Sequence, residues 1–413
     1  MNPPRRAPTE LQQLSILIAT CAIDMIGFAM ILPLLPYYAL KLNATPELIG
    51  LMTATFSVAQ LFAAPYWGRL SDRYGRRPIL LIGLSASAVA YVIFGLATSV
   101  WLLFLSRLVQ GAGGGTTGVA QAYVADTIRP SGRAKALGWL SAATSAGVAV
   151  GPAIGSFSHA YLGPSAPGFV AAALCLINVA FAWRWLPESR VPMPPGGTAP
   201  IRRPVWAAAA EVFEHPSMPI SRLIWIYGTG MFAFSCLTSV LALFLDARFG
   251  VTEETIGYFY SYVGALSFLM RSLFLGPIVA RFGETRTMRA GTGILVAGLM
   301  LYTVAPNVWA LAFIIPLVPI GTALLFPSTT AMMSRLSPRE QLGTTMGVAQ
   351  TFAGVARVAA PLLATGAFQR IGHDSPFYLS AVTVAIVGLM ALRIEPVPMH
   401  TAETPVPKPE GSG

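Results

Sequence analysis

The chain has little charge for its length. Of its 413 residues only 11% are charged and 54% are hydrophobic, whereas soluble proteins carry roughly 25% charged residues. This composition excludes a soluble globular protein. The 39 glycines and 33 prolines follow no three-residue period and form no long polar tract, which excludes a collagen-like chain and wholesale disorder.

Residues that build catalytic and metal sites are also scarce. The cysteines, Cys21, Cys175 and Cys236, fall in separate apolar runs and predict neither a disulfide framework nor a zinc site. The histidines fall in predicted loops or the tail and lack metal-ligand spacing: His159, His215, His373 and His400. The sequence has no P-loop and no Ser/His/Asp set. We therefore expect no enzyme activity, no bound metal and no cofactor.

Long apolar runs dominate what is present, and they predict twelve membrane-spanning helices. The predicted spans lie near residues 14–38, 48–68, 79–97, 102–123, 136–158, 166–186, 223–245, 255–276, 290–304, 308–332, 345–367 and 376–394. In the fourth span, Gly113, Gly115 and Gly118 match a dinucleotide-binding pattern. Because no strand precedes them, close helix packing is the better interpretation.

An internal repeat divides these spans into two sets of six. Gly68, Arg73 and Gly75 recur 208 residues later as Gly276, Arg281 and Gly283. Pro130 recurs at the same offset as Pro338, and Pro152 recurs 209 residues later as Pro361. We therefore predict an all-α integral membrane protein of two pseudo-symmetric six-helix bundles, an architecture that transporters use for alternating access.

The predicted domain boundaries follow from the spans. They are a cytoplasmic N-terminal segment (1–13), a first bundle (14–186), a cytoplasmic linker (187–222), a second bundle (223–394) and a disordered cytoplasmic tail (395–413). Within the linker, residues 204–215 are expected to form a short helix on the membrane surface.

The distribution of Lys and Arg predicts the orientation. Of the 27 such residues, 21 fall on one side of the membrane when both termini are placed inside. Three fall on the other side (Lys41, Arg248 and Arg370) and three within spans (Arg107, Arg271 and Arg357). The net charge of +10 thus reflects topology, with lipid headgroups rather than nucleic acid as the partner. We therefore expect a multi-pass protein of the cell membrane, which in a bacterium would be the inner membrane.

The segment between the second and third spans carries the most specific motif. Its spaced residues are Gly68, Asp72, Arg73, Gly75, Arg76 and Arg77, followed by Pro78. Glycines permit a tight turn between two helices, and Asp72 can pair with a guanidinium. This segment resembles the signature gating loop of the major facilitator superfamily, and the weaker copy at Gly276 resembles that of its second half.

The fifth predicted span has small residues along one helix face. Gly147, Gly151 and Gly155 are spaced by four residues, with Pro152 among them, and such spacing lets helices approach closely. This pattern is similar to the Gly-Pro motif of antiporters in the superfamily, although Ser156 replaces a glycine. Simple helix packing is the alternative interpretation.

Asp24 in the first span and Arg107 in the fourth are the candidate proton-coupling residues. An ionisable group within a membrane span is functional by default, and Asp24 is the only acid deep in a predicted span. Their estimated heights in the membrane differ by roughly 6 Å. Both positions resemble the drug:proton antiporters, including the tetracycline-resistance group. A structural ion pair is the alternative.

The resemblance implies proton-coupled multidrug efflux by alternating access, carried out by an antiporter that we expect to be a monomer. The acids and histidine that tetracycline exporters use fall at Ala90, Ser267 and Leu295, which argues against a metal–tetracycline substrate. Candidate residues of the substrate cavity are Arg357, Arg271, Gln110 and Phe28. The two arginines motivate an alternative, a metabolite, organic-anion or lipid transporter. A non-transporting membrane sensor is the second alternative.

Overall fold

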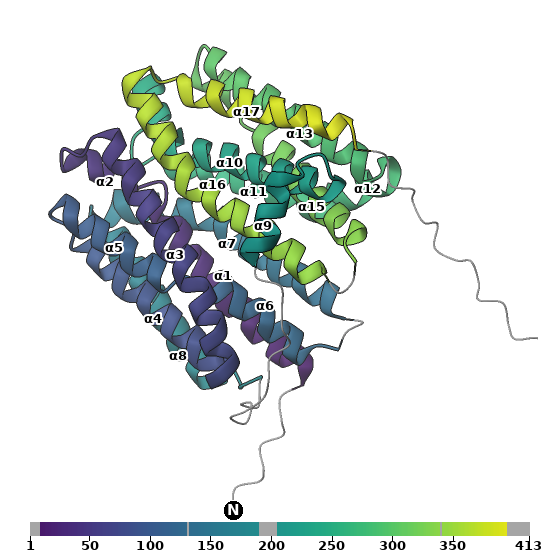
Figure 1. Cartoon of the computed structure of the whole chain (residues 1–413). Coiled ribbons are helices and arrows are strands. Elements are labelled where there is room, and N and C mark those ends of the chain that lie inside the picture. The colour runs from purple at the N-terminus through teal and green to yellow at the C-terminus, as the bar shows by residue number, and fades with distance from the viewer. Residues whose placement is uncertain (1–8, 130–131, 190–204, 339–340, 395–413) are drawn as a thin grey trace, which may run out of the picture.

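The computed structural model describes residues 9–129, 132–189, 205–338 and 341–394 (Figure 1). Parts of the predicted N-terminal segment and linker, and the whole predicted tail, lie outside these residues. The first half contains α1 (Glu10–Ile31), α2 (Leu35–Lys41), α3 (Pro46–Tyr74), α4 (Arg76–Gly95), α5 (Val100–Ala112), α6 (Thr116–Thr127), α7 (Arg133–Leu162) and α8 (Ala166–Trp185).

The second half is built in the same way. After the short helix α9 (Val205–Glu214) it contains α10 (Pro219–Phe249), α11 (Ile256–Leu269), the π-helical turn η1 (Met270–Phe274), α12 (Leu275–Phe282), α13 (Glu284–Val304), α14 (Val308–Ile314), α15 (Leu317–Leu336), α16 (Leu342–Arg370) and α17 (Ser375–Leu392). Within the described residues the secondary structure is helical throughout, which confirms the predicted fold class.

Among the described residues, eleven helical stretches are long and apolar enough to cross a membrane. Helices satisfy their own backbone hydrogen bonds, which hydrocarbon requires because it offers none. The remaining predicted span, the fourth, is interrupted, since α5 ends at Ala112 and α6 begins at Thr116. A methyl group on Gly113 would lie only 2.6 Å from Ala86 Cβ. The glycine pattern there is therefore a helix break as well as a close packing contact.

Three other spans also depart from a regular helix. Pro33 and Pro36 accompany the turn between α1 and α2, and Pro316 precedes α15. The eighth span passes through η1, which contains Arg271. Proline removes a backbone donor, and π-helical turns are frequently found at functional sites. These departures locate the positions where the helices are not simple membrane spans.

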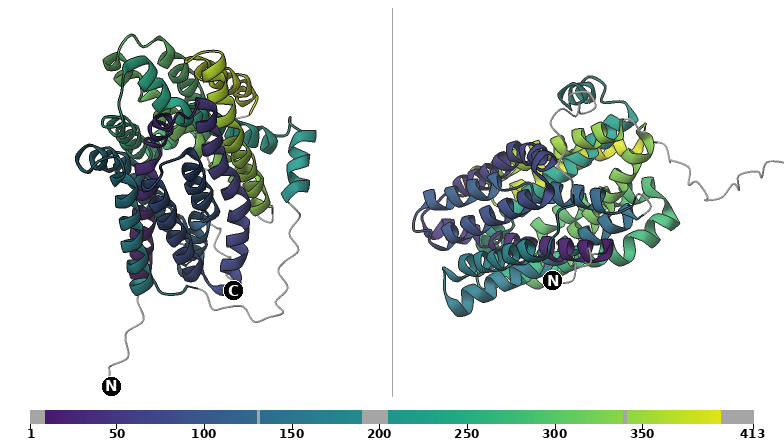
Figure 2. Two further views of the ribbon diagram at one scale, coloured as in Figure 1. Left: turned by 90° about the vertical axis from the view of Figure 1, so that its left-hand side faces the viewer. Right: turned by 90° about the horizontal axis from the view of Figure 1, so that it is seen from below.

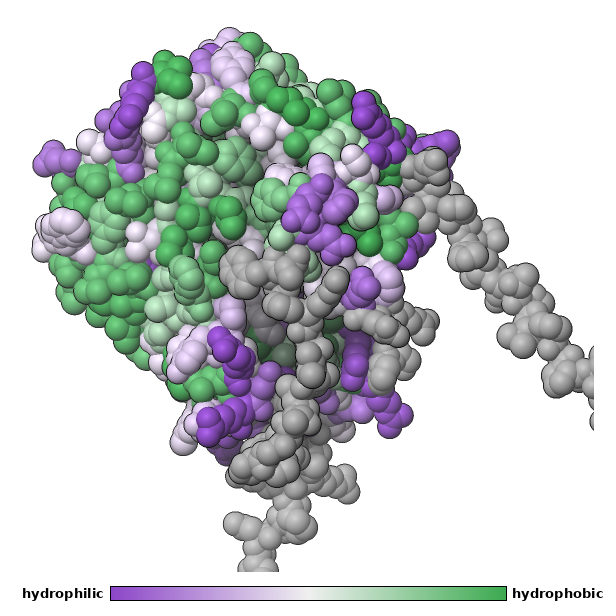
Figure 3. Space-filling model, in the orientation of Figure 1, coloured by the Kyte–Doolittle hydropathy of each residue, from purple (hydrophilic) through white to green (hydrophobic). Residues whose placement is uncertain are grey.

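The two halves meet at one end of the molecule, which we call the distal end. It carries the loops at 42–45, 163–165, 250–255 and 371–374, whereas the described chain ends lie at the opposite, terminal end. From the distal end, at the upper left of Figure 1, α17 runs toward the right while α4 and α8 run toward the bottom. In Figure 3, hydrophobic residues cover much of the left side and hydrophilic residues gather at the lower end.

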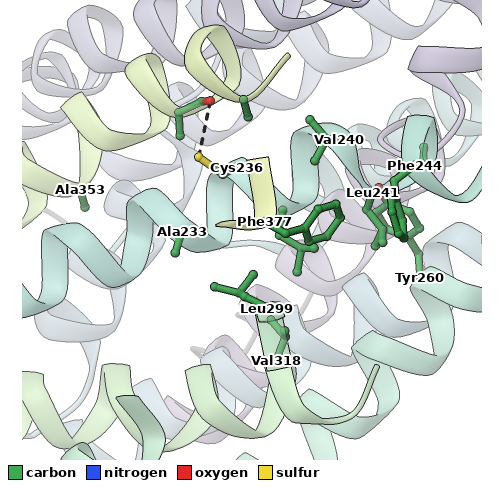
Figure 4. Packing of buried hydrophobic residues seen from close by; sticks show 14 of the residues in the cluster. Ala233, Cys236, Val240, Leu241, Phe244, Tyr260, Leu299, Val318, Ala353 and Phe377 are labelled. Atoms are coloured by element: carbon green, nitrogen blue, oxygen red, sulfur yellow. Dashed lines mark hydrogen bonds between the residues drawn. The ribbon is translucent and has the colours of Figure 1, made fainter. Parts of the chain in front are cut away.

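The buried core follows the same division. One cluster joins both halves near the distal end and continues through the second half. Within it the Phe244 and Phe377 rings lie 4.6 Å apart and Cys236 Sγ donates to Ala360 O at 3.7 Å (Figure 4). A second cluster lies within the first half alone, around Leu80 and Tyr123. The three cysteines are free and buried, as packing residues are.

The predicted linker helix is present as α9. It stands at the side of the bundle (Figure 2) and contacts α16 and α10. The Phe213 ring stacks on Phe352 and meets Trp225 edge-on, with both pairs of centroids 5.2 Å apart. An aromatic contact thus attaches this helix to the second half.

Candidate functional site

The Asp24 carboxyl is buried inside the first half. Its residue is 7% exposed, and Thr116 Oγ1 donates to Asp24 Oδ2 at 3.2 Å. Thr116 is the first residue of α6, so the glycine break in the fourth span brings its hydroxyl to α1. A hydroxyl can donate to a carboxylate or accept from a carboxylic acid. The same contact therefore serves both protonation states of Asp24.

Arg107 does not pair with Asp24 in this conformation, contrary to the expectation from their heights. Among the ion pairs of the described residues, none joins the two side chains. Arg107 is 2% exposed and its guanidinium lies over the Phe94 ring, 5.8 Å from the centroid. Heights along two helices do not fix the direction in which each side chain points.

Tyr91 lies near both of these groups. Its hydroxyl accepts a hydrogen bond from Gln110 Nε2 at 2.8 Å, and both Asp24 and Arg107 lie within its electrostatic range. Gln110 is buried and its Oε1 has no hydrogen-bond partner, like Nε of Arg107. Polar groups without partners are costly in a low-dielectric interior, so their presence here indicates a function. The first half therefore contains a polar cluster around Asp24 whose hydrogen bonds are incomplete.

The glycine face of α7 packs directly on α1, the helix that carries Asp24. A methyl group on Gly147, Gly151 or Gly155 would lie 2.5 to 2.6 Å from a carbonyl oxygen of α1. Contacts that close leave no room for a side chain, so the two backbones touch along three turns. The predicted antiporter-type glycines thus lie beside the candidate proton site.

Another face of α7 packs on α11 of the second half. A methyl group on Gly257 would lie 2.2 Å from Pro152 O, and one on Gly264 would lie 2.6 Å from Ala149 Cα. Ser261 Oγ accepts from the Ala153 backbone N–H at 3.1 Å. Pro152 is therefore part of the contact between the two halves, and α7 is closely packed on both sides.

A polar cluster at the distal end also joins the halves. Glu253 of the second half pairs with Lys41, and its carboxylate lies 3.5 Å from His159 Nε2. We call Lys41, His159 and Glu253 the distal latch. His159 is buried in α7, so its placement in a loop was wrong; α7 continues for several residues past the predicted end of the span.

The pKa of Glu253 reflects the two basic side chains beside it. Burial raises the pKa of this carboxyl, but the hydrogen bond and charge of Lys41 and the charge of His159 outweigh burial. The pKa therefore lies below the usual range, and the ionised form that holds the latch is favoured.

The distal end is closed by further contacts. Glu47 pairs with Arg370, Tyr37 donates to Val251 O at 2.6 Å, and Ser156 donates to Glu253 O at 2.8 Å. The hydrogen bonds and ion pairs that join described residues of the two halves all lie at this end or along α7 and α11 nearby. The molecule is thus held in a distal-closed conformation.

The signature loop is organised around Arg76. Gly75 has φ of 101°, which favours glycine. The buried Arg76 guanidinium pairs with Asp72 and Asp126, each at 2.8 Å. Glu188 accepts from the backbone N–H groups of Arg76 and Arg77 at 2.8 and 3.0 Å, and so caps the start of α4. The loop is therefore tied to the ends of the fourth and sixth spans.

The remaining signature residues have lesser contacts. Arg73 is exposed and its guanidinium lies 5.3 Å from the Tyr74 ring centroid. Gly68 has open space where a methyl group would be. Arg77 donates to Trp183 O, which adds a third link to the sixth span.

In the second half, Arg357 and Arg271 approach one phenol. Arg357 Nε donates to Ala353 O of its own helix at 3.3 Å. Both guanidinium groups lie within electrostatic range of Tyr227, whose hydroxyl accepts from Gln350 Nε2 at 3.3 Å. Phe28, the other candidate, lies in the first half with its ring centroid 5.7 Å from that of Phe56.

Sequence reasoning missed several of these residues. They are Thr116, Tyr91, Asp126, Glu188, Lys41, Glu253, Tyr227 and Gln350. Asp126 and Glu188 carry a signal, since each is an acid at the end of a span that faces a basic loop. The others are common residue types whose partners are distant in sequence.

Known proteins resemble the chain over most of its length. The family model described as Major Facilitator Superfamily matches residues 17–274 and 223–412. The tetracycline resistance protein, class B, of Escherichia coli is 27% identical and covers 84% of this chain and 86% of that protein. Multidrug resistance protein 1 of Bacillus subtilis is 28% identical over 90% of this chain and 94% of that protein.

Solved structures support the same architecture. The human organic anion transporter MFSD10 (TETRAN) has a TM-score of 0.69 at 21% identity, covering 93% of this chain and all of that one. A bacterial homolog of the human lysosomal transporter Spinster, in an inward-facing and unoccupied conformation, has a TM-score of 0.72 at 15% identity, covering 94% and 97%. At these identities the likeness concerns the fold alone.

Proposed function

Because the chain belongs to the Major Facilitator Superfamily, we propose that this multi-pass membrane transporter exports small amphipathic compounds in exchange for protons. Its relatives with drug-resistance names support export. The observation that carries the proposal is Asp24, a buried carboxyl held by the hydroxyl of Thr116 and by no cation among the described residues. A proton can neutralise such a group without breaking an ion pair.

Alternating access supplies the transport cycle. The distal end is closed, and the excess of basic residues at the terminal end supports placing that end, with both chain termini, in the cytoplasm. The conformation then accepts substrate from the cytoplasm. Protonation of Asp24 favours one arrangement of α1 on α7 and substrate favours the other, so the two ligands exchange.

Arg107 acts in the step of the cycle that releases the proton from Asp24. In this conformation Arg107 makes no ion pair with Asp24 among the described residues, and Tyr91 lies near both. A rearrangement that lets the guanidinium reach Asp24 would expel the proton, since a nearby cation favours the carboxylate. The signature loop, tied by Asp72, Arg76 and Asp126, opens and closes the terminal end.

Transport by purified protein in proteoliposomes tests this function. With a pH gradient imposed, the wild type should concentrate a substrate dye and Asp24→Asn should not, while downhill exchange survives in the variant. Glu254→Gln, which alters an exposed acid, is the control and should behave as the wild type. Concentrative transport by Asp24→Asn would refute the proton site, and absence of flux in the wild type would favour the sensor hypothesis.

A further inference from the structure

The second half contains two arginines for which the proton site gives no role. Arg357 uses Nε for its own helix, and among the described residues no carboxylate pairs with either Arg357 or Arg271. Charged groups within a membrane are expensive and normally have partners. Two unpaired cations near one phenol also repel each other. An anion is the partner that this arrangement lacks.

The position of Arg357 on α16 directs it toward the first half. Positions 350, 354, 357 and 361 share one helix face. A methyl group on Gly354 would lie 2.7 Å from Leu61 Cδ1, and one on Gly50 would lie 2.8 Å from Pro361 O, and both Leu61 and Gly50 belong to α3. Arg357 therefore lies between two contacts with the opposite half, on the face that a substrate between the halves would meet.

Arg271 lies on the neighbouring helix of the same half. Arg271 is exposed and lies seven residues after Gly264. Gly264 is on the face of α11 that packs on α7. The π-helical turn η1 places it beyond the end of that packed contact. Tyr227, which lies within electrostatic range of both arginines, adds a hydroxyl, and the exposed Gln350, bonded to that hydroxyl, adds an amide. The Phe326 ring, 5.4 Å from that of Tyr227, adds an apolar surface.

We propose that Arg271, Arg357, Tyr227 and Gln350 form a subsite for the carboxylate or sulfonate of an amphipathic organic anion. The inference rests on the proposed export function and names its substrate class. Guanidinium groups form paired hydrogen bonds to such anions, which an ammonium cannot. The aromatic body of the substrate then lies against Phe326 and the first half. The proton is carried separately, by Asp24.

Two xanthene dyes of opposite charge test the subsite. Binding of the anion fluorescein and the cation rhodamine 6G to protein in nanodiscs is measured by fluorescence anisotropy. Arg357→Ala and Arg271→Ala should each weaken fluorescein binding by about tenfold or more, the effect of losing a charged hydrogen bond. Rhodamine 6G binding should change by less than about twofold, and Arg357→Lys should recover part of the fluorescein affinity.

The controls separate charge, folding and coupling. Arg281→Ala removes the same charge from the same span at an exposed position and should leave both affinities unchanged. Arg357→Gln removes the charge but keeps most of the methylene stem and a polar amide, and it replaces Arg357→Ala if that variant fails to fold. Equal losses for both dyes, or wild-type binding of rhodamine 6G alone, would overturn the inference. Asp24→Asn should retain fluorescein binding. The test of the anion subsite therefore does not depend on whether Asp24 carries the proton.

Discussion

The distal latch gives the sharpest prediction, because Glu253 holds two groups of the opposite half. Glu253→Gln removes the carboxylate from Lys41 and His159 and keeps the side-chain shape. A hydrogen bond between charged groups contributes about 1.5–3 kcal/mol, but the Lys41 side chain is 54% exposed, and exposed pairs contribute about 1 kcal/mol or less. We therefore expect a shift of about 1–2 kcal/mol toward the distal-open conformation, which is about 5- to 30-fold in population.

Spin labels measure this shift directly. Leu162 and Ile371 lie in opposite halves beside the distal loops and are 68% and 79% exposed, so cysteines there accept labels without disturbing the core. The distance between the two spin labels, measured by double electron–electron resonance, should gain a longer component in Glu253→Gln. The neighbouring Glu254→Gln should match the wild type. An unchanged distance distribution in Glu253→Gln, or equal changes in both variants, would refute the role of the latch.

Two further predictions concern pH and orientation. Because the pKa of Glu253 is lowered, the closed form gains stability above the usual carboxyl pKa of about 4.3 and loses it only as pH falls through the lowered value. The variant His159→Gln leaves Lys41, Glu254 and Asp246 as the charged neighbours of Glu253. In this variant the distal end should stay closed from pH 7 to 5. Opening near pH 6 in the same distance measurement would contradict this expectation. For orientation, Ser165→Cys should react with an impermeant thiol reagent from outside intact cells and Gly132→Cys should not; the reverse pattern would invert the topology.

The sequence predicted the spans well because length and hydropathy suffice for them. It did not predict the interruptions. The π-helical turn at Met270–Phe274 depends on tertiary packing and has no composition of its own. The glycines at 113–115 were visible, but whether they bend, break or only pack a helix depends on what lies beside them. Here Ala86 and Trp67 lie there, which no local pattern reveals.

Sequence reasoning selected Asp24 and the signature-loop arginines but not most of the residues that contact them. Asp24 is conspicuous because an acid within an apolar run is rare. Thr116, which bonds to it, is one of many threonines and lies 92 positions away. The latch joins Lys41, the last residue of α2, to Glu253 in the loop between α10 and α11, across 212 positions. Partners such as these are set by which helices become neighbours, and a single sequence does not contain that information.

The packing of α7 explains how a proton at Asp24 can affect the second half. One face of α7 touches the α1 backbone at Gly147 and Gly151, and another touches α11 at Gly257. Close-packed interfaces do not compress; they shift between discrete arrangements. A movement of α1 that follows neutralisation of Asp24 must therefore slide on the glycine face or displace α7 and, with it, α11. Because Arg271 continues the α11 span, such a displacement moves one of the two guanidinium groups of the proposed anion subsite. Exchange of proton for anion then requires no direct contact between Asp24 and the substrate.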